Sequence, residues 1–155
     1  MNKLLDKKTL AKRYERIYFQ LKELVKQTDD VIAHMATIVA VLHNKMPKYF
    51  WTGFYCLHKK KLIVGPYQGS LACQILEKDK GVCWECINRK NPIIVPDVHQ
   101  FEGHIACDSR TNSEIVIPLF DKKDDVWAVL DIDSVKFNAF SEVDRDWLKE
   151  IVKLV

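Results

Sequence analysis

The 155-residue sequence lacks any long hydrophobic run. No stretch approaches the roughly 18 consecutive apolar residues that a membrane span requires. The opening residues, MNKLLDKKTLAKRYERIY, also lack the apolar segment that follows the charges of an export signal. We therefore expect a cytoplasmic protein that makes no membrane contact.

The sequence also lacks a strong excess of charge of either sign. It has 24 Lys plus Arg against 21 Asp plus Glu, and no basic block is longer than the three lysines at 59–61. This balance argues against nucleic acid as a partner. The length suits one ordinary domain with one core, and no repeat or linker divides the chain, so we expect a single domain spanning residues 1–155.

The cysteines lack the even count of a static disulfide framework, and no secretion signal accompanies them. There are five: Cys56, Cys73, Cys83, Cys86 and Cys107. Catalytic, redox and metal-binding roles are therefore open. An intracellular cysteine is more often a small buried hydrophobe, and we expect this of Cys56, which lies in a strand-like run.

Apolar residues at helical spacing predict two N-terminal helices and one C-terminal helix. The first has the stripe Leu10, Tyr14, Ile17, Leu21 and Leu24. Thr28 can cap the second, which ends at Pro47 and has the stripe Val31, Met35, Ile38, Leu42 and Met46. Ser141 and Asp144 form a capping-box-like start to the last, whose stripe is Val143, Trp147, Ile151 and Leu154.

The intervening residues are typical of strands, because aromatic and β-branched side chains alternate between turn signals. We predict a hairpin followed by two short strands and a central antiparallel pair, over residues 49–58, 61–69, 72–77, 92–96, 114–120 and 126–134. Pro118 indicates a bulge or an edge in its strand. A short helix is expected at 81–90. The pattern favours an α+β sandwich with the helices packed on one face of the sheet.

Residues 97–113 form a long polar loop, and such loops in small domains are more often functional than idle. Cys107 lies in it, near His104 and Asp108. A nearby histidine or helix N-terminus can lower the pKa of a thiol, whereas the Asp108 charge would oppose this if it faced the sulfur. A second thiol, Cys73 or Cys83, can discharge a sulfenic acid formed on the first. The alternative is that both are core residues.

A zinc site competes with the redox interpretation. Cys83 and Cys86 form C-x-x-C, and His104 and Cys107 form H-x-x-C, which together resemble a four-ligand zinc set. Against this, the first pair falls within a predicted helix, whereas zinc ribbons usually place each ligand pair on a turn. We therefore expect no metal and keep zinc as the alternative.

Asp131 and Asp133 end a core strand and, two residues apart, point to the same face. Neighbouring buried carboxylates are costly unless they meet cations or share protons, so the pattern favours a ligand ammonium or a proton-sharing site. Glu114, at the start of the adjacent strand, could join them. The other interpretation places these acids in water at the sheet ends. Trp51 and Tyr55 could wall a pocket or be ordinary core aromatics.

Several short motifs, in their order and spacing, resemble the free methionine-(R)-sulfoxide reductases, a family with the GAF fold. The resemblance covers nearly the whole chain. It rests on WTGFY at 51–55, GPYQG at 65–69, the Cys73 segment, GVC at 81–83, PDVHQFEGHIACD at 96–108, NSEI at 112–115 and LDIDS at 130–134. One departure follows Cys83, where the family usually has glycine and this chain has Trp84, Glu85 and Cys86.

The resemblance implies a six-stranded antiparallel sheet with helices packed against it. It implies that Cys107 attacks free methionine sulfoxide, that Cys73 resolves the resulting sulfenic acid as a disulfide, and that Cys83 is auxiliary. Thioredoxin would supply the reducing equivalents, with no bound cofactor. The same resemblance places five residues around the substrate: Trp51, Tyr55, Glu114, Asp131 and Asp133.

Two further alternatives stay open at this point. A GAF module that binds a small ligand without chemistry would have the same fold. The oligomeric state, monomer or homodimer, is not determined by these patterns.

Overall fold

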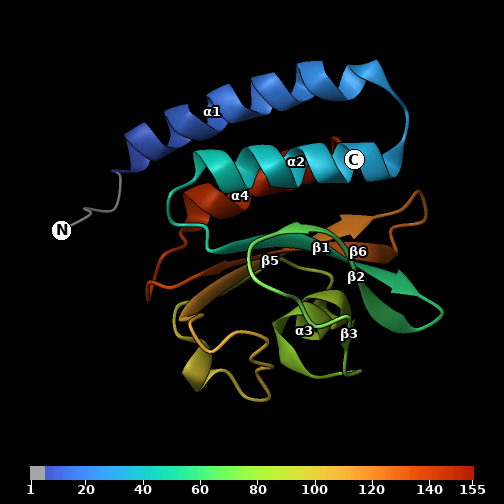
Figure 1. The fold of residues 1–155 in the computed structure, drawn as a ribbon, viewed down its shortest axis with the longest axis vertical. Helices are drawn as coiled ribbons and strands as arrows, with labels where there is room; N and C mark the ends of the chain where they lie inside the picture. Colours follow the sequence, from blue (N-terminus) through green and yellow to red (C-terminus); the bar gives the residue numbers. More distant parts are fainter. Residues whose placement is uncertain (1–5) are drawn as a thin grey trace.

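Four helices and a six-stranded sheet make up the computed structural model, which describes residues 6–155 (Figure 1). Residues 1–5, part of the segment in which we found no export signal, lie outside the described residues. Among the helices of 6–155, none combines the length and the apolar character needed to cross a membrane.

The sheet is antiparallel throughout, as the resemblance implied. Its strand order is β3-β2-β1-β6-β5-β4. The strands are β1 (Trp51–His58), β2 (Lys61–Gln68), β3 (Ile75–Leu76), β4 (Ile93–Val95), β5 (Ser113–Phe120) and β6 (Val126–Ser134). The predicted hairpin is β1–β2, and the predicted central pair is β5–β6. β3 is shorter than predicted, so Cys73 lies in a loop and not in a strand.

The helices cover both faces of the sheet, which corrects the expectation that they pack on one. Helices α1 (Lys7–Leu24), α2 (Val31–Lys45) and α4 (Glu142–Val152) lie on one side of the sheet, whereas α3 (Gly81–Arg89) lies on the other (Figure 1). A short amphipathic helix can cover either face, and its residues do not specify which one. The α3 side is where the site forms.

Alternation along the strands gives each face its own apolar cluster. Ile115, Leu130 and Ile132 belong to the cluster under α1, α2 and α4. Val116 and Val129 belong to the cluster that packs against α3. The opposite pointing of neighbouring side chains along a strand explains this division, and it sends every second residue of β5 and β6 toward α3.

Three local expectations differ from the structure. Asp30, not Thr28, caps α2, because its carboxylate accepts from the backbone N–H of Ala33 at 2.7 Å. Leu24 and Val31, expected in the apolar stripes of α1 and α2, are 42% and 44% exposed. In α4 the fully buried apolar residues are Leu148 and Ile151, while Val143 and Trp147 are only partly buried. Leu154, also partly buried, lies beyond the end of the helix at Val152.

Pro118 lies where its strand has a free side. It pairs with Val129 of β6, but β4 ends opposite Val116, and the register of β5 shifts between Leu119 and Phe120. A residue without an N–H is tolerated at such an edge, as predicted.

A buried carboxylate ties α4 to the rest of the helical layer. Asp144 is fully buried and accepts from Lys48 Nζ at 2.5 Å, Tyr14 Oη at 2.7 Å and the backbone N–H of Ser141 at 2.8 Å. Tyr14 also contacts the hydroxyl of Tyr49. The capping box predicted at Ser141 is therefore part of a network that reaches α1.

We predict that Asp144→Ala lowers the free energy of unfolding by about 3–5 kcal/mol, because it leaves the buried Lys48 ammonium unpaired. Urea unfolding followed by circular dichroism measures the change. Asp146→Ala on the same helix, at an exposed ion pair with Arg145, is the matched control and should leave the midpoint nearly unchanged. Equal loss in both variants would contradict the role of the network.

Candidate functional site

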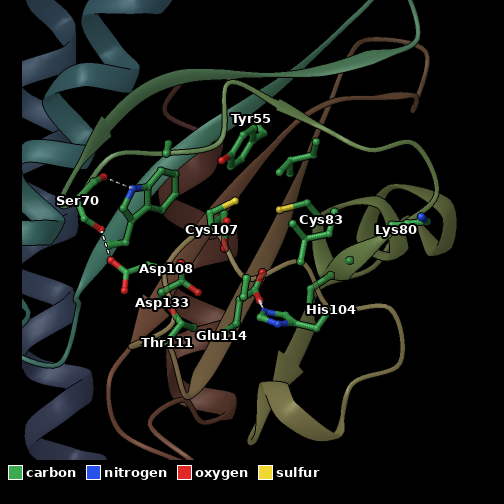
Figure 2. Close-up of a pocket in the computed structure, with 18 of the residues that line it drawn as sticks. Tyr55, Ser70, Lys80, Cys83, His104, Cys107, Asp108, Thr111, Glu114 and Asp133 are labelled. Carbon is green, nitrogen blue, oxygen red and sulfur yellow. Dashed lines mark hydrogen bonds and ion pairs between the residues drawn. The ribbon is translucent and has the colours of Figure 1, made fainter.

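A pocket that is partly open to solvent lies on the α3 side of the sheet (Figure 2). Seven of the eight residues singled out from the sequence line it: Trp51, Tyr55, Cys83, Cys107, Glu114, Asp131 and Asp133. They come from β1, α3, β5, β6 and the loop before β5. Side chains alternate along β6, so the same register that buries Leu130 and Ile132 on the opposite face directs Asp131 and Asp133 into the pocket.

The eighth residue, Cys73, is joined to Cys107 by a disulfide. Cys107 is exposed and Cys73 is half-buried, so the bond lies where the pocket opens to solvent. The Tyr55 hydroxyl donates to the carbonyl of Cys73 at 3.1 Å and holds the Cys73 backbone against β1. The structure therefore contains the pair that the resemblance implied.

The zinc set of three cysteines and one histidine is not assembled. The Cys107 sulfur is bonded to Cys73, and Cys86 is fully buried with its thiol directed at the carbonyl of Val116, 3.8 Å away. His104 contacts Glu114 instead, with Nε2 at 3.4 Å from Oε2. The zinc hypothesis for Cys83, Cys86, His104 and Cys107 was therefore wrong, because the helix directs Cys86 into the core.

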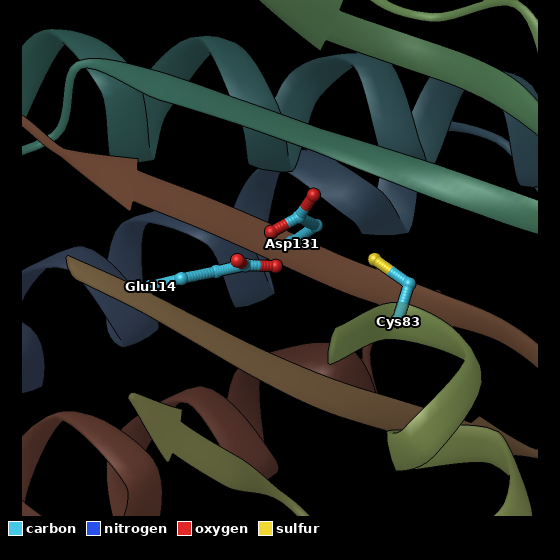
Figure 3. A group of neighbouring side chains, drawn as sticks. All are labelled: Cys83, Glu114 and Asp131. Carbon is cyan, nitrogen blue, oxygen red and sulfur yellow. The ribbon is translucent and has the colours of Figure 1, made fainter. Parts of the chain in front are cut away.

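A thiol and two carboxyl groups meet at the base of the pocket (Figure 3). Cys83 Sγ and one oxygen each of Glu114 and Asp131 lie within 4.8 Å of one another, and all three residues are buried. Oδ1 of Asp131 has no hydrogen-bond partner in the structure. This is an electron-rich, desolvated corner of the pocket.

Burial raises the pKa of all three carboxyl groups. Loss of water raises the pKa of Glu114 and Asp131 well above the ordinary values, and the negative charges of neighbouring carboxylates add to the effect. Burial and the Asp131 charge act in the same way on the pKa of Asp133, which is partly exposed. The same causes raise the pKa of the Cys83 thiol. The pocket therefore holds protons that such groups lose in water.

These donor atoms are also the one described group of three that could hold a metal ion. Binding would require the thiol and both carboxyls to lose their protons. Their raised pKa values oppose that loss. Protons shared among Cys83, Glu114 and Asp131 therefore suffice to explain why these groups lie together.

Burial lowers the pKa of the His104 imidazole near this corner. The ring contacts the Glu114 carboxyl group. The sequence suggested that His104 could lower the pKa of Cys107, but the ring contacts Glu114 instead.

Trp51 and Tyr55 form one wall of the pocket and belong to a stack of three aromatic rings. The Trp51 ring lies 5.8 Å from that of Tyr55 and 5.5 Å from that of Tyr67. Gly53 makes room for the stack, because a Cβ there would lie 2.9 Å from Trp51 Cζ3 and 2.5 Å from Tyr67 Cβ. Trp51 and Tyr55 are thus buried aromatics and wall residues at once.

Trp84, the departure from the family pattern, is buried beneath the pocket. Its Nε1 donates to the carbonyl of Leu76 at 3.4 Å and links α3 to β3. The large ring does not displace Cys83, which still faces Glu114 and Asp131.

Sequence reasoning missed three residues beside the disulfide. Ser70 donates to Asp108 at 2.8 Å, Arg110 forms a two-point ion pair with the same carboxylate, and the Arg110 guanidinium lies 4.6 Å from the centre of the Phe50 ring. Arg110 keeps the pKa of Asp108 well below its usual range. The Asp-x-Arg spacing was a visible signal for the ion pair, whereas nothing in the sequence indicated Ser70.

We predict that Glu114→Gln changes how stability depends on pH. The pKa of Glu114 in the folded protein lies above the ordinary value of 4.5. Between these two pKa values the folded protein keeps a proton that the unfolded chain has lost, so the stability of the wild type falls as pH rises through this interval. Glutamine has no such proton. The variant should gain on wild type by about 1.4 kcal/mol per pH unit in that interval, measured by urea unfolding between about pH 5 and about pH 8.

The control is Glu102→Gln, at an exposed acid in the loop that precedes β5. Its stability relative to wild type should not change with pH. A Glu114→Gln difference that is flat, or that shrinks as pH rises, would contradict the buried-proton assignment.

Comparison with known proteins connects this pocket to a family. Residues 28–155 match the GAF domain. The free methionine-R-sulfoxide reductase of Escherichia coli K12 is 40% identical over 121 residues, which are 78% of this chain and 73% of that protein.

Two solved structures agree. That of free methionine-R-sulfoxide reductase from Neisseria meningitidis, in complex with its substrate, superposes with a TM-score of 0.89 at 35% identity, over 93% of this chain and 86% of that one. That of fRMsr of Staphylococcus aureus in its reduced form gives 0.86 at 38% identity, over 91% of each chain. The described residues therefore have the GAF fold, and the chain belongs to the free methionine-R-sulfoxide reductase family of GAF-domain proteins.

Proposed function

We propose that this protein reduces the (R)-sulfoxide of free L-methionine to methionine, with Cys107 as the catalytic thiol and Cys73 as the resolving thiol. The observation that carries the proposal is the Cys73–Cys107 disulfide at the opening of a pocket whose base holds buried acids with raised pKa values. Relatives of the same family act on this substrate according to their names.

In the first step, the Cys107 thiolate attacks the sulfoxide sulfur while a pocket carboxyl donates a proton to the sulfoxide oxygen. The S–O bond of the substrate then breaks, and its oxygen passes with the added proton to the Cys107 sulfur, which becomes a sulfenic acid. Methionine leaves as the sulfur–sulfur bond formed in the attack breaks. The substrate sulfur gains two electrons and the cysteine sulfur loses two. Protonation matters because it makes the sulfur a better electrophile.

In the second step, the Cys73 thiolate attacks the sulfenic sulfur of Cys107. The sulfur–sulfur bond of the disulfide forms, the S–O bond of the sulfenic acid breaks, and the oxygen leaves as water after taking up a second proton. A dithiol donor of the thioredoxin class then reduces the disulfide by exchange and takes up the oxidation as its own disulfide. The exposure of Cys107 supports such an exchange, because the incoming thiolate must reach a sulfur.

Different pocket residues are suited to recognise different groups of the substrate. Glu114 and Asp131, the buried pair with raised pKa values, are suited to hold the proton that the oxygen receives. Carboxylates that ionise bind the substrate's ammonium, and Asp133, the most exposed of the three acids, is suited to this. Trp51 and Tyr55 enclose the methyl and methylene groups, and Cys83 is an auxiliary thiol beside the acids.

We predict that Cys107→Ser reduces turnover by roughly a thousandfold or more, because no other thiol takes over the nucleophile's role. The measurement is NADPH oxidation coupled through thioredoxin and thioredoxin reductase, with free L-methionine-(R)-sulfoxide as substrate. Cys56→Ser, at the half-buried cysteine of the other sheet face, is the control and should keep wild-type turnover. Absence of turnover in the unmodified enzyme would instead favour a ligand-binding module without chemistry.

Cys73→Ser separates the two chemical steps. The variant should convert about one substrate per chain and then stall, because a sulfenic acid on Cys107 has lost its partner. Chromatographic quantification of methionine, with mass spectrometry of the Cys107 peptide, measures both. Sustained thioredoxin-driven cycling would show that another thiol, Cys83 foremost, resolves the sulfenic acid.

A further inference from the structure

Asp108, the residue after the catalytic thiol, holds two segments together with one carboxylate. Its Oδ1 accepts from the backbone N–H and the Nε of Arg110 at 2.9 and 3.0 Å. Its Oδ2 accepts from Arg110 Nη2 at 2.7 Å and from the Ser70 hydroxyl at 2.8 Å. Neither cysteine sulfur is among these partners, so none of the bonds requires the disulfide.

The bond from Ser70 to Asp108 crosses between the loops that carry the two reacting cysteines (Figure 2). We name residues 69–74 the Cys73 loop and residues 103–111 the Cys107 loop. Among the described residues, the Ser70–Asp108 bond is the one side-chain hydrogen bond that joins these two loops, and the disulfide is the covalent link between them.

The Cys73 loop has its own attachment to the sheet. Trp51 Nε1 donates to the carbonyl of Ser70 at 3.1 Å, and the Tyr55 hydroxyl donates to the carbonyl of Cys73 at 3.1 Å. Both donors belong to the buried strand β1. Ser70 is therefore a fixed point to which another segment can be tied.

The Cys107 loop has no comparable backbone attachment. Its backbone hydrogen bonds among the described residues are local, from His104 N–H to the Phe101 carbonyl and from Thr111 N–H to the Asp108 carbonyl. When the disulfide is reduced, the Ser70–Asp108 bond is the remaining side-chain hydrogen bond among the described residues that joins the Cys107 loop to the Cys73 loop, whereas the His104–Glu114 contact ties the Cys107 loop to β5.

Arg110 makes the carboxylate suitable for this task. The guanidinium neutralises the Asp108 charge beside the thiolate, and its place over the Phe50 ring holds the pair against the start of β1. The charge that the sequence suggested would oppose thiolate formation at Cys107 is thus directed at Arg110 and Ser70.

We propose that Asp108 is a positioning residue that, through Ser70, keeps the reduced Cys107 loop against the Cys73 loop and so raises the effective concentration of the two thiols. The inference rests on the proposed function, in which Cys73 must reach the sulfenic acid of Cys107. Holding the loops together favours the disulfide at equilibrium and speeds its formation.

The test measures the reduction potential of the Cys73–Cys107 pair in glutathione buffers, with mass spectrometry quantifying that disulfide. Asp108→Ala and Ser70→Ala should each make the disulfide easier to reduce, by about tenfold in its equilibrium constant, which is about 30 mV. Ser70→Ala is the sharper variant, because it leaves the Asp108–Arg110 ion pair intact and removes the bond between the loops.

Asp97→Asn is the matched control. Its carboxylate also organises the segment before β5, accepting from the backbone N–H of His99 and from Gln100 Nε2 at 3.0 Å each, without contact to Ser70. It should keep the wild-type potential. Potentials of Ser70→Ala and Asp108→Ala equal to that of the control would overturn the proposal, and Ser70→Ala alone decides if Asp108→Ala does not fold.

A second measurement follows the sulfenic acid on Cys107 by dimedone trapping after one equivalent of methionine sulfoxide. Longer survival in Ser70→Ala than in wild type is expected, and equal lifetimes would count against the link. The potential needs no methionine sulfoxide, so failure of the proposed function, seen as absent turnover, is distinguishable from failure of this inference.

Discussion

The alternation of side chains along β6 is the constraint on which the site depends. Leu130 and Ile132 are completely buried under the helices of one face, and this fixes the direction of Asp131 and Asp133 toward the other. A slip of one residue would drive both acids into hydrocarbon. Burial of Leu130 and Ile132 in the main apolar core therefore fixes the register of β6, and this register alone orients Asp131 and Asp133 into the pocket.

The two kinds of thiol in the pocket differ because their surroundings differ. Cys83 is buried beside Glu114 and Asp131, where its pKa is raised and its neutral form is favoured. Cys107 lies on an exposed loop away from that burial, and Arg110 offsets the nearest charge. One pocket thus combines a desolvated region around Cys83, where raised pKa values favour protonated groups, with the accessible sulfur of Cys107.

Much of the fold was predictable from the sequence because burial imposes a period on it. The stripe of α1, the β1–β2 hairpin and the spacing of Asp131 and Asp133 all show that period directly. The face covered by α3 was not predictable, since a helix of nine residues fits either side. Nor was the meeting of Ser70 with Asp108, which depends on how two loops close in three dimensions and leaves no local pattern.

The disulfide also has a mechanical consequence. It joins positions 34 residues apart, and the ring of chain so closed contains β3, α3 and β4. Cross-linking a ring of this size restricts the unfolded chain by roughly 3–4 kcal/mol in a chain-entropy account. If the protein cycles as proposed, each catalytic round forms and breaks the cross-link around β3, α3 and β4, which help to build the pocket. This part of the fold is therefore most resistant to unfolding in the oxidised state, before the reductant acts.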